Sequence, residues 1–268
     1  MLKDITLGQF FPGNSSIHRL DPRTKLLMVV VYIIALFTAK SWLGYLILFG
    51  FLALAVKLST ISPKVLVRGM KPIVMIVIFT AVLNLLFTPD GSVLVHFWVI
   101  TITTGGVSRA IMMTCRILML ISATFLMTYT TSPIRLTDGL ESLMGPLNKI
   151  KVPVHELSMM MSIALRFIPT LIEETDKIMS AQKARGADFE NGSLMERARA
   201  LIPILVPLFI GAFRRADELA TAMECRCYHG GEGRTKMNQL HYQRSDFLAF
   251  GSGAALVAVV LGINALGL

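Results

Sequence analysis

Long apolar segments alternate with short basic segments along most of this chain. Five apolar segments are candidates for membrane spans: residues 26–39, 42–56, 73–87, 107–129 and 247–268. A spanning helix needs roughly 17 to 25 mostly apolar residues, and the first three segments have shorter charge-free cores. The pattern predicts an all-α integral membrane protein with about five transmembrane helices, plus long helices outside the membrane.

One long segment, residues 153–228, is polar enough to lie outside a membrane and still has the periodicity of helices. From Leu157 to Met179, apolar residues recur at steps of three and four, and polar residues fill much of the neighbouring stripe. This spacing is typical of an amphipathic α-helix. Pro169 lies inside the predicted helix, where it removes one backbone donor, so we expect a kink there.

A second long helix is predicted to begin near Leu194. Its segment 200–213 is almost wholly apolar and contains Pro203 and Pro207. Fourteen residues do not readily cross a bilayer. We therefore expect a buried or interfacial part of the helix, bent by its prolines.

Each of these two helices is predicted to end at an arginine. The first ends at Ala184, Arg185 and Gly186, and the second at Cys225, Arg226 and Cys227. Glycine commonly follows a helix C-terminus because it accepts a positive φ, and we expect this conformation at Gly186.

The composition agrees with a membrane protein, because 54% of the residues are hydrophobic and only 16% are charged. The net charge of +9 does not indicate nucleic acid, since residues 131–246 carry 15 Lys and Arg against 14 Asp and Glu. The remaining excess of positive charge lies beside or within the apolar segments. Lipid, rather than nucleic acid, is the expected surrounding.

Lys and Arg gather before the first span and in residues 57–71, and are missing from residues 72–107. The positive-inside rule then places the N-terminus and residues 130–246 in the cytoplasm, and the C-terminus outside. The predicted organisation is a membrane domain of four spans (1–130), a cytoplasmic domain (131–245) and a last transmembrane helix (246–268).

Shorter elements are predicted between the spans. Residues 88–91 carry a turn motif, and the β-branched residues of 93–104 suggest a small hairpin or interfacial segment. Asp21 with Pro22, and Ser132 with Pro133, are each typical of a helix start. Together with its neighbouring basic residues, the first of these pairs is interpreted as a topology anchor.

Arg116 lies within the fourth apolar segment, where a buried arginine is costly. Either it has a specific polar partner, for which Asn84 is one candidate, or it extends to the membrane surface from a span that starts late.

The sequence shows no catalytic or cofactor-binding motif. There is no phosphate-binding loop, no Ser/His/Asp set and no His-Glu-x-x-His motif. Cys225 and Cys227 are separated by one residue, and only His229 and the distant His241 accompany them, so we expect neither zinc nor another cofactor. Acidic residues are absent from all five spans, which argues against an ion-coupled secondary transporter.

Three sequence stretches resemble the transmembrane T component of energy-coupling factor (ECF) importers. They are Leu-Asp-Pro-Arg-Thr-Lys at 20–25, Thr-Ser-Pro at 131–133 with Asp-Gly-Leu-Glu at 138–141, and Ala-Leu-Arg-Phe-Ile-Pro at 164–169 leading to Ala-Gln-Lys-Ala-Arg-Gly at 181–186. The second arginine triplet departs from the Ala-Arg-Gly form of the first because it contains two cysteines.

The resemblance implies a non-catalytic subunit that joins two cytoplasmic ATPases to a separate membrane protein, which captures a vitamin or a metal. It also implies that the triplets at 184–186 and 225–227 dock in grooves of the ATPases, so that residues 131–245 form a coupling domain of a cell-membrane transporter. The competing hypotheses are a self-sufficient secondary transporter and an integral membrane enzyme. The first would need an inverted repeat or carboxylates at membrane depth, and the second a catalytic set.

Overall fold

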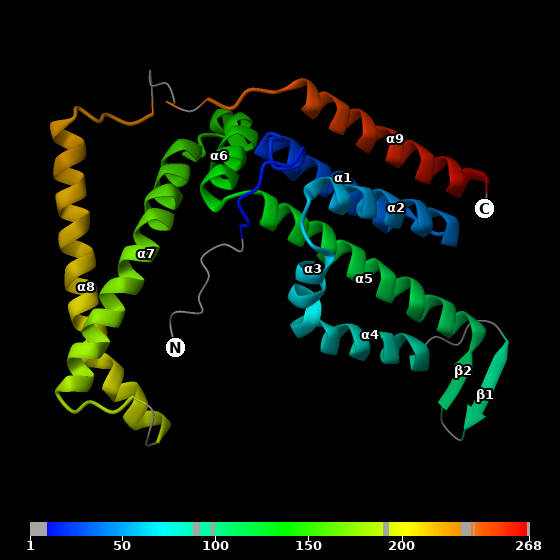
Figure 1. Ribbon diagram of the computed structural model, residues 1–268, viewed down its shortest axis with the longest axis horizontal. Coiled ribbons are helices and arrows are strands. Elements are labelled where there is room, and N and C mark those ends of the chain that lie inside the picture. The colour runs from blue at the N-terminus through cyan, green and yellow to red at the C-terminus, as the bar shows by residue number, and fades with distance from the viewer. Residues whose placement is uncertain are drawn as a thin grey trace. The chain divides into compact units, whose positions relative to one another are not determined.

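The computed structural model describes residues 10–87, 92–97, 100–189, 193–231, 237 and 239–266. Within these ranges the regular secondary structure is helical apart from one small hairpin (Figure 1). The longer helices are α1 (Pro22–Thr38), α2 (Trp42–Ser59), α4 (Val74–Phe87), α5 (Thr104–Thr130), α7 (Val154–Ala184), α8 (Leu194–Cys225) and α9 (Arg244–Leu266). Shorter helices are α3 (Pro63–Met70) and α6 (Pro133–Met144), with 3₁₀ turns at Lys71–Ile73 and Gly145–Ile150. The predicted all-helical membrane fold is confirmed.

The hairpin consists of β1 (Val93–Phe97) and β2 (Ile100–Thr103), which pair antiparallel. It lies in the segment where the sequence predicts a hairpin or an interfacial segment. The turn predicted at residues 88–91 lies outside the described residues.

Four described helices are long and apolar enough to cross a membrane: Trp42–Ser59, Pro63–Phe87, Thr104–Thr130 and Arg244–Leu266. They correspond to the last four predicted spans, and residues 267–268 of the last span lie outside the described residues. The second of them combines α3 and α4, and it bends at the 3₁₀ turn that contains Pro72 (Figure 1). The first predicted span corresponds to α1, which has only 17 residues and carries Arg23 and Lys25 in its first turns.

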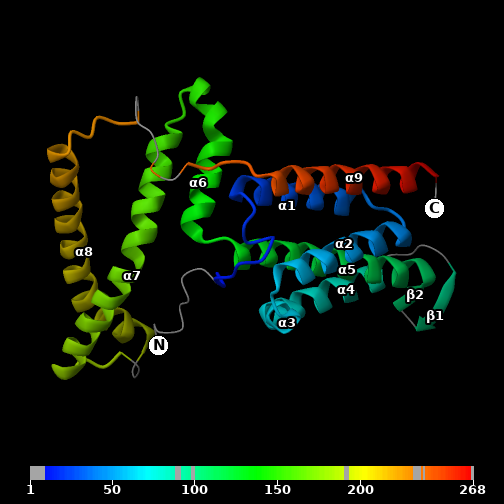
Figure 2. The same cartoon turned by 45° about the horizontal axis from the view of Figure 1, so that its top comes forward.

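The chain divides into two compact units, which we name the membrane unit (residues 10–139 and 240–266) and the α7–α8 unit (residues 140–239). The chain passes between them twice, within α6 and just before Leu240. In the membrane unit, α1 packs against α9, α5 and α2, and α5 also packs against α4 (Figure 2). The core is formed by Tyr32, Ala35, Leu36, Ala39, Tyr45, Leu48, Leu52, Met119, Ala123, Leu256 and Val260.

Polar contacts show how the helices of the membrane unit are directed. Asp21 contacts Asp246 at one end of α1 and α9, and Asn264 Nδ2 donates to the Thr38 carbonyl at the other end, so these helices run parallel. The end of α5 meets the start of α1, because Lys25 Nζ donates to the carbonyl of Thr130, so α5 runs antiparallel to α1.

The structure corrects the Asn84 hypothesis for Arg116. Asn84 Nδ2 donates to the carbonyl of Thr80 in its own helix, at 2.8 Å. Arg116 instead directs Nη2 to the Ala39 carbonyl at 3.4 Å, and its guanidinium lies 5.4 Å from the centre of the Phe37 ring. Arg116 therefore meets the carbonyl just after the last turn of α1, where a positive charge is favourable.

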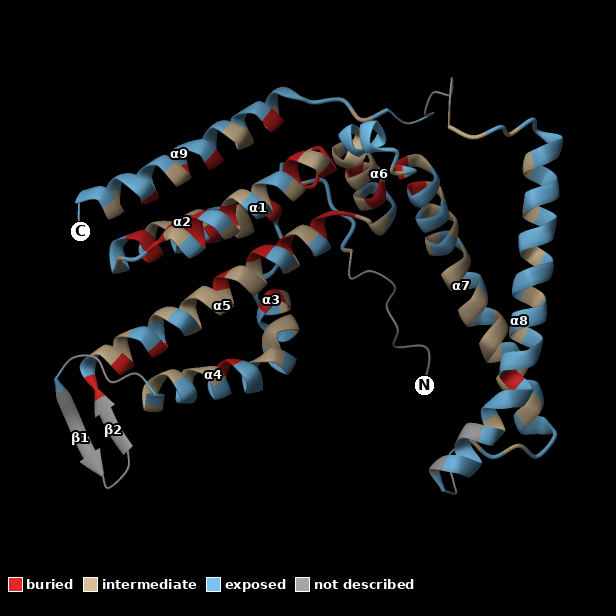
Figure 3. Cartoon of the chain, turned by 180° about the vertical axis from the view of Figure 1, so that it is seen from behind, coloured by how far each residue is buried: buried red, intermediate tan, exposed pale blue. Residues whose placement is uncertain are grey.

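In the α7–α8 unit, few of the described residues are buried (Figure 3). Only Val154, Ser158 and Ile204 are buried among the described side chains of α7 and α8. Glu141 of α6 binds the start of α7, accepting from Ser158 Oγ at 2.5 Å and contacting His155 Nδ1 at 3.1 Å. Most of the described surface of α7 and α8 is therefore not covered within this unit.

Candidate functional site

The first arginine triplet forms a complete C-terminal cap on α7. Arg185 is the capping residue, and Gly186 has φ +89°, which confirms the expected positive φ. The Gly186 amide donates to the Lys183 carbonyl, and the Ala187 amide donates to the Gln182 carbonyl, both at 3.0 Å. These two bonds define a Schellman motif, which satisfies carbonyls that would otherwise lack partners.

The second triplet forms the same cap on α8. Arg226 is the capping residue, with φ −94° against −87° for Arg185, and Cys227 has φ +54°. The Cys227 amide donates to the Glu224 carbonyl at 2.9 Å, and the Tyr228 amide donates to the Met223 carbonyl at 3.0 Å. Cys227 therefore takes the place of Gly186 in backbone conformation, although a side chain makes this conformation less favourable.

All six residues of the two triplets are exposed. Neither Arg185 nor Arg226 has an ion pair within the described part of the chain. Each guanidinium lies at a helix C-terminus, where the helix dipole favours a positive charge. Both arginines therefore have equivalent backbone geometry and exposed side chains.

The two helices cross at an ion pair between Glu174 of α7 and Arg215 of α8. Arg215 Nη2 lies 2.8 Å from Glu174 Oε2, and both side chains are more than two-thirds buried, at 27% and 29% exposed. At Gly211 the helices approach closely, because a Cβ there would lie 2.9 Å from Glu174 Oε1.

The arginine triplets lie on opposite sides of this crossing. Gln182, near the end of α7, donates to the Pro203 carbonyl near the start of α8, so the two helices run antiparallel. Arg185 follows Glu174 by eleven residues, and Arg226 follows Arg215 by eleven. About 33 Å of helix therefore separates the two capped ends.

Exposed apolar residues form a stripe along α8. Its members follow one another at alternating steps of one and three residues. They are Leu201, Ile202, Leu205, Val206, Phe209, Ile210 and Phe213. The sequence left open whether this segment is buried or interfacial, and within this chain only Ile204 of its residues is buried. Met160 and Met161 of α7 are also exposed. The stripe is one helical face, and the described residues of the α7–α8 unit do not cover it.

No group of three or more His, Cys, Asp or Glu side chains that could hold a metal ion occurs among the described residues. Cys225 and Cys227 are both exposed.

Sequence reasoning located the arginines but missed Glu174 and Arg215. Their equal spacing from the two arginines is visible in the sequence. When the chain is shifted by 41 residues, Arg185 aligns with Arg226 and Glu174 aligns with Arg215. Glu174 and Arg215 carry opposite charges at equivalent positions of two helices, which indicates a contact between the helices.

A family model described as CbiQ, cobalt transport protein, matches residues 13–237. Several curated relatives carry the name energy-coupling factor transporter transmembrane protein EcfT. The one from Acidaminococcus fermentans is 55% identical over 92% of this chain and 92% of its own length. The relatives from Clostridium kluyveri and Bacillus subtilis are 51% and 46% identical, and the alignments cover at least 97% of every chain. The chain therefore belongs to the CbiQ family, as a transmembrane component of an energy-coupling factor transporter.

Proposed function

We propose that this chain is the non-catalytic coupling subunit of an ECF importer, which transmits ATP-driven motion from two cytoplasmic ATPases to a separate membrane subunit that captures a vitamin or a metal. The observation that carries this proposal is the pair of exposed arginines, each held by the same cap at the end of a long helix. Two helix ends with equivalent backbone geometry could each bind one of two similar ATPase subunits.

The chemistry of the arginines fits docking to acidic grooves. A guanidinium presents parallel N–H donors and binds a carboxylate at two points, which fixes direction as well as position. Because each arginine caps its helix, a movement of the partner against the guanidinium acts along the helix. The proposed docking residues are Ala184, Arg185, Gly186, Cys225, Arg226 and Cys227.

The proposed contact for the capture subunit is the apolar stripe of α8, together with Met160 and Met161. A membrane protein offers apolar helix faces, and burying such faces against each other is favourable. Methionine side chains repack easily, which suits a partner that changes position during transport.

The proposed orientation follows from charge and helix direction together. Because α1 and α9 run parallel and α5 runs antiparallel to α1, the starts of α1 and α9 and the end of α5 share one face of the membrane unit. Arg23, Lys25, Arg135 and Arg244 lie near that face in sequence. The positive-inside rule makes it the cytoplasmic face of the cell membrane, with residues 131–245 as the cytoplasmic coupling domain.

Copurification tests this proposal. The tagged chain, extracted from its own cells in mild detergent, should retain two ATPase subunits and a second small membrane protein, identified by mass spectrometry. Extraction of the intact chain without any ATPase would contradict the proposal.

A further inference from the structure

The first turn of α1 carries buried charges that the proposed docking sites do not use. Asp21 and Lys25 are each 6% exposed, and Asp246 of α9 is fully buried. Charged side chains are rarely buried unless they are paired, because leaving water is costly. This turn lies in the segment that the sequence suggests as a topology anchor, but an anchor would need only exposed positive charge, such as that of Arg19.

The first chain crossing between the units is held by this turn. Gly139, the last residue of the membrane unit before the crossing, lies so close to α1 that a Cβ would be 3.0 Å from the Cβ of Pro22. Just upstream, Lys25 Nζ donates to the carbonyl of Thr130 at 2.8 Å and to Thr131 Oγ1 at 3.2 Å.

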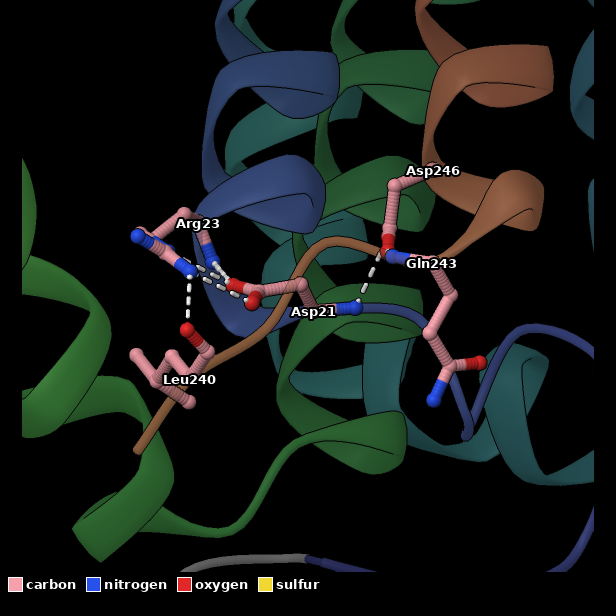
Figure 4. A network of polar contacts seen from close by, with 5 residues as sticks. All are labelled: Asp21, Arg23, Leu240, Gln243 and Asp246. Atoms are coloured by element: carbon pink, nitrogen blue, oxygen red, sulfur yellow. Dashed lines mark hydrogen bonds and ion pairs between the residues drawn. The ribbon is translucent and has the colours of Figure 1, made fainter. Parts of the chain in front are cut away.

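The second chain crossing is held by the same turn (Figure 4). Leu240 is the first residue of the membrane unit after the crossing, and its carbonyl accepts from Arg23 Nη2 at 3.0 Å. The Arg23 guanidinium is itself fixed by two contacts with the Asp21 carboxylate, at 3.0 and 3.1 Å.

Asp246 ties the start of α9 to the same place. Its carboxylate accepts from the Gln243 amide at 2.7 Å and from the Asp21 amide at 2.9 Å (Figure 4). The segment from Leu240 to Asp246 is therefore bound to α1 at both ends. The Arg23 guanidinium also lies 4.1 Å from the centre of the Tyr242 ring, which adds a cation–π contact between them.

We propose that residues 21–25 form a clasp that holds both chain crossings to the membrane unit, and that the clasp passes motion of the α7–α8 unit to the membrane helices. The inference rests on the proposed coupling function. Without the clasp, the two connecting segments between the units would be flexible. The α7–α8 unit could then move without moving the membrane helices. Arg23 and Lys25 are positioning residues in this account.

Spin-label distances in the purified complex test the clasp. Spin labels are attached to an unnatural keto amino acid introduced at Ser180 in the α7–α8 unit and at Lys57 in the membrane unit, both exposed, so that Cys225 and Cys227 stay in place. Distances are measured before and after addition of Mg-ATP. Arg23→Lys keeps the positive charge but loses the two-point contact with Asp21.

Arg23→Lys should at least double the width of the distance distribution without nucleotide and abolish its shift on ATP addition, while the ATPases stay bound. Gly139→Ala, at the first chain crossing, should broaden the distribution and abolish its ATP shift in the same way. Arg19→Lys and Gly145→Ala are the matched controls, because Arg19 is exposed and a Cβ at Gly145 meets nothing within 4 Å.

Distributions and ATP shifts in Arg23→Lys and Gly139→Ala that equal those of the controls would overturn the clasp. If the unsubstituted chain retains no ATPase, the coupling function fails instead. The width without nucleotide then still decides whether residues 21–25 hold the crossings.

Discussion

At the scale of single residues, one backbone conformation explains why a glycine in one triplet and a cysteine in the other serve the same purpose. Gly186 and Cys227 both have positive φ immediately after an arginine that caps a helix. The conformation turns the chain sharply away and leaves the arginine at the tip. The hydrogen bonds of the cap set the same backbone conformation at each arginine.

The first prediction concerns Gly186. Gly186→Val places a β-branched side chain at positive φ, which costs about 1 to 3 kcal/mol. The altered cap should misdirect Arg185 and weaken ATPase binding to the purified chain by roughly 5- to 150-fold. Ala187→Val is the control, because Ala187 needs no positive φ. Equal ATPase binding by the two variants would show that the cap does not direct Arg185.

A second prediction concerns Cys227, where glycine should improve the cap. Cys227→Gly removes the steric cost of positive φ, roughly 1 to 2 kcal/mol, and should slow hydrogen exchange of the Tyr228 amide, which donates within the cap. Cys225→Gly is the control, because Cys225 lies inside α8, where glycine destabilises the helix by about 1 kcal/mol. Faster exchange in Cys227→Gly than in the unsubstituted chain would contradict the prediction.

At the scale of elements, the crossing of α7 and α8 sets how far apart the two arginines lie. The helices make few buried contacts, so the Glu174–Arg215 ion pair is the main specific interaction at the crossing. Sequence periodicity predicted both helices and both ends correctly because those features are local. The crossing joins residues 41 positions apart, so the sequence indicates it through the repeated register of charges and not through a local pattern.

A charge exchange tests the crossing. Glu174→Arg alone should destabilise the crossing by about 1 to 2 kcal/mol, between the values for exposed and buried pairs. It should also broaden the distance distribution between labels at Ser180→Cys and Thr221→Cys. Glu174→Arg with Arg215→Glu should restore most of the distribution.

The control for the charge exchange is the Arg214–Glu218 pair, which lies within α8 and is 81% and 66% exposed. Arg214→Glu should leave the distances unchanged. A broadened distribution that persists in the double exchange at positions 174 and 215 would show that another contact sets the crossing.

At the scale of the whole molecule, the sequence predicted the membrane class, the long helices and the arginine tips, but it left the ends of the first three spans open. Hydropathy, capping residues and turn residues act locally, and each leaves a pattern in the sequence. The partner of Arg116 and the contacts of Asp21 with Asp246 were missed because they join residues 77 and 225 positions apart. Such pairs follow from packing of the helices and not from any short motif.

Orientation in the membrane is a prediction at this scale. In a background without the native cysteines, an impermeant thiol reagent applied to sealed cells should label Lys40→Cys and leave Met195→Cys unlabelled. Both positions are exposed. Lys40 follows α1, and Met195 lies in α8. Permeabilised cells are the control, in which both positions should react. The reverse pattern in sealed cells would overturn the cytoplasmic placement of the α7–α8 unit.

The central claim is that Arg185 and Arg226 each bind one ATPase, and ATPase retention by the purified chain tests it most directly. Loss of one partner of a desolvated charge pair costs roughly 2 to 5 kcal/mol. Arg185→Ala or Arg226→Ala alone should therefore weaken retention, and the double variant should nearly abolish it. Lysine at either position should rescue poorly, because an ammonium cannot make the planar two-point contact.

Lys177→Ala with Arg214→Ala is the matched control, since it removes two exposed positive charges from the same two helices. This control should retain both ATPases at the level of the unsubstituted chain. Retention of both ATPases by Arg185→Ala with Arg226→Ala at that same level would contradict the account.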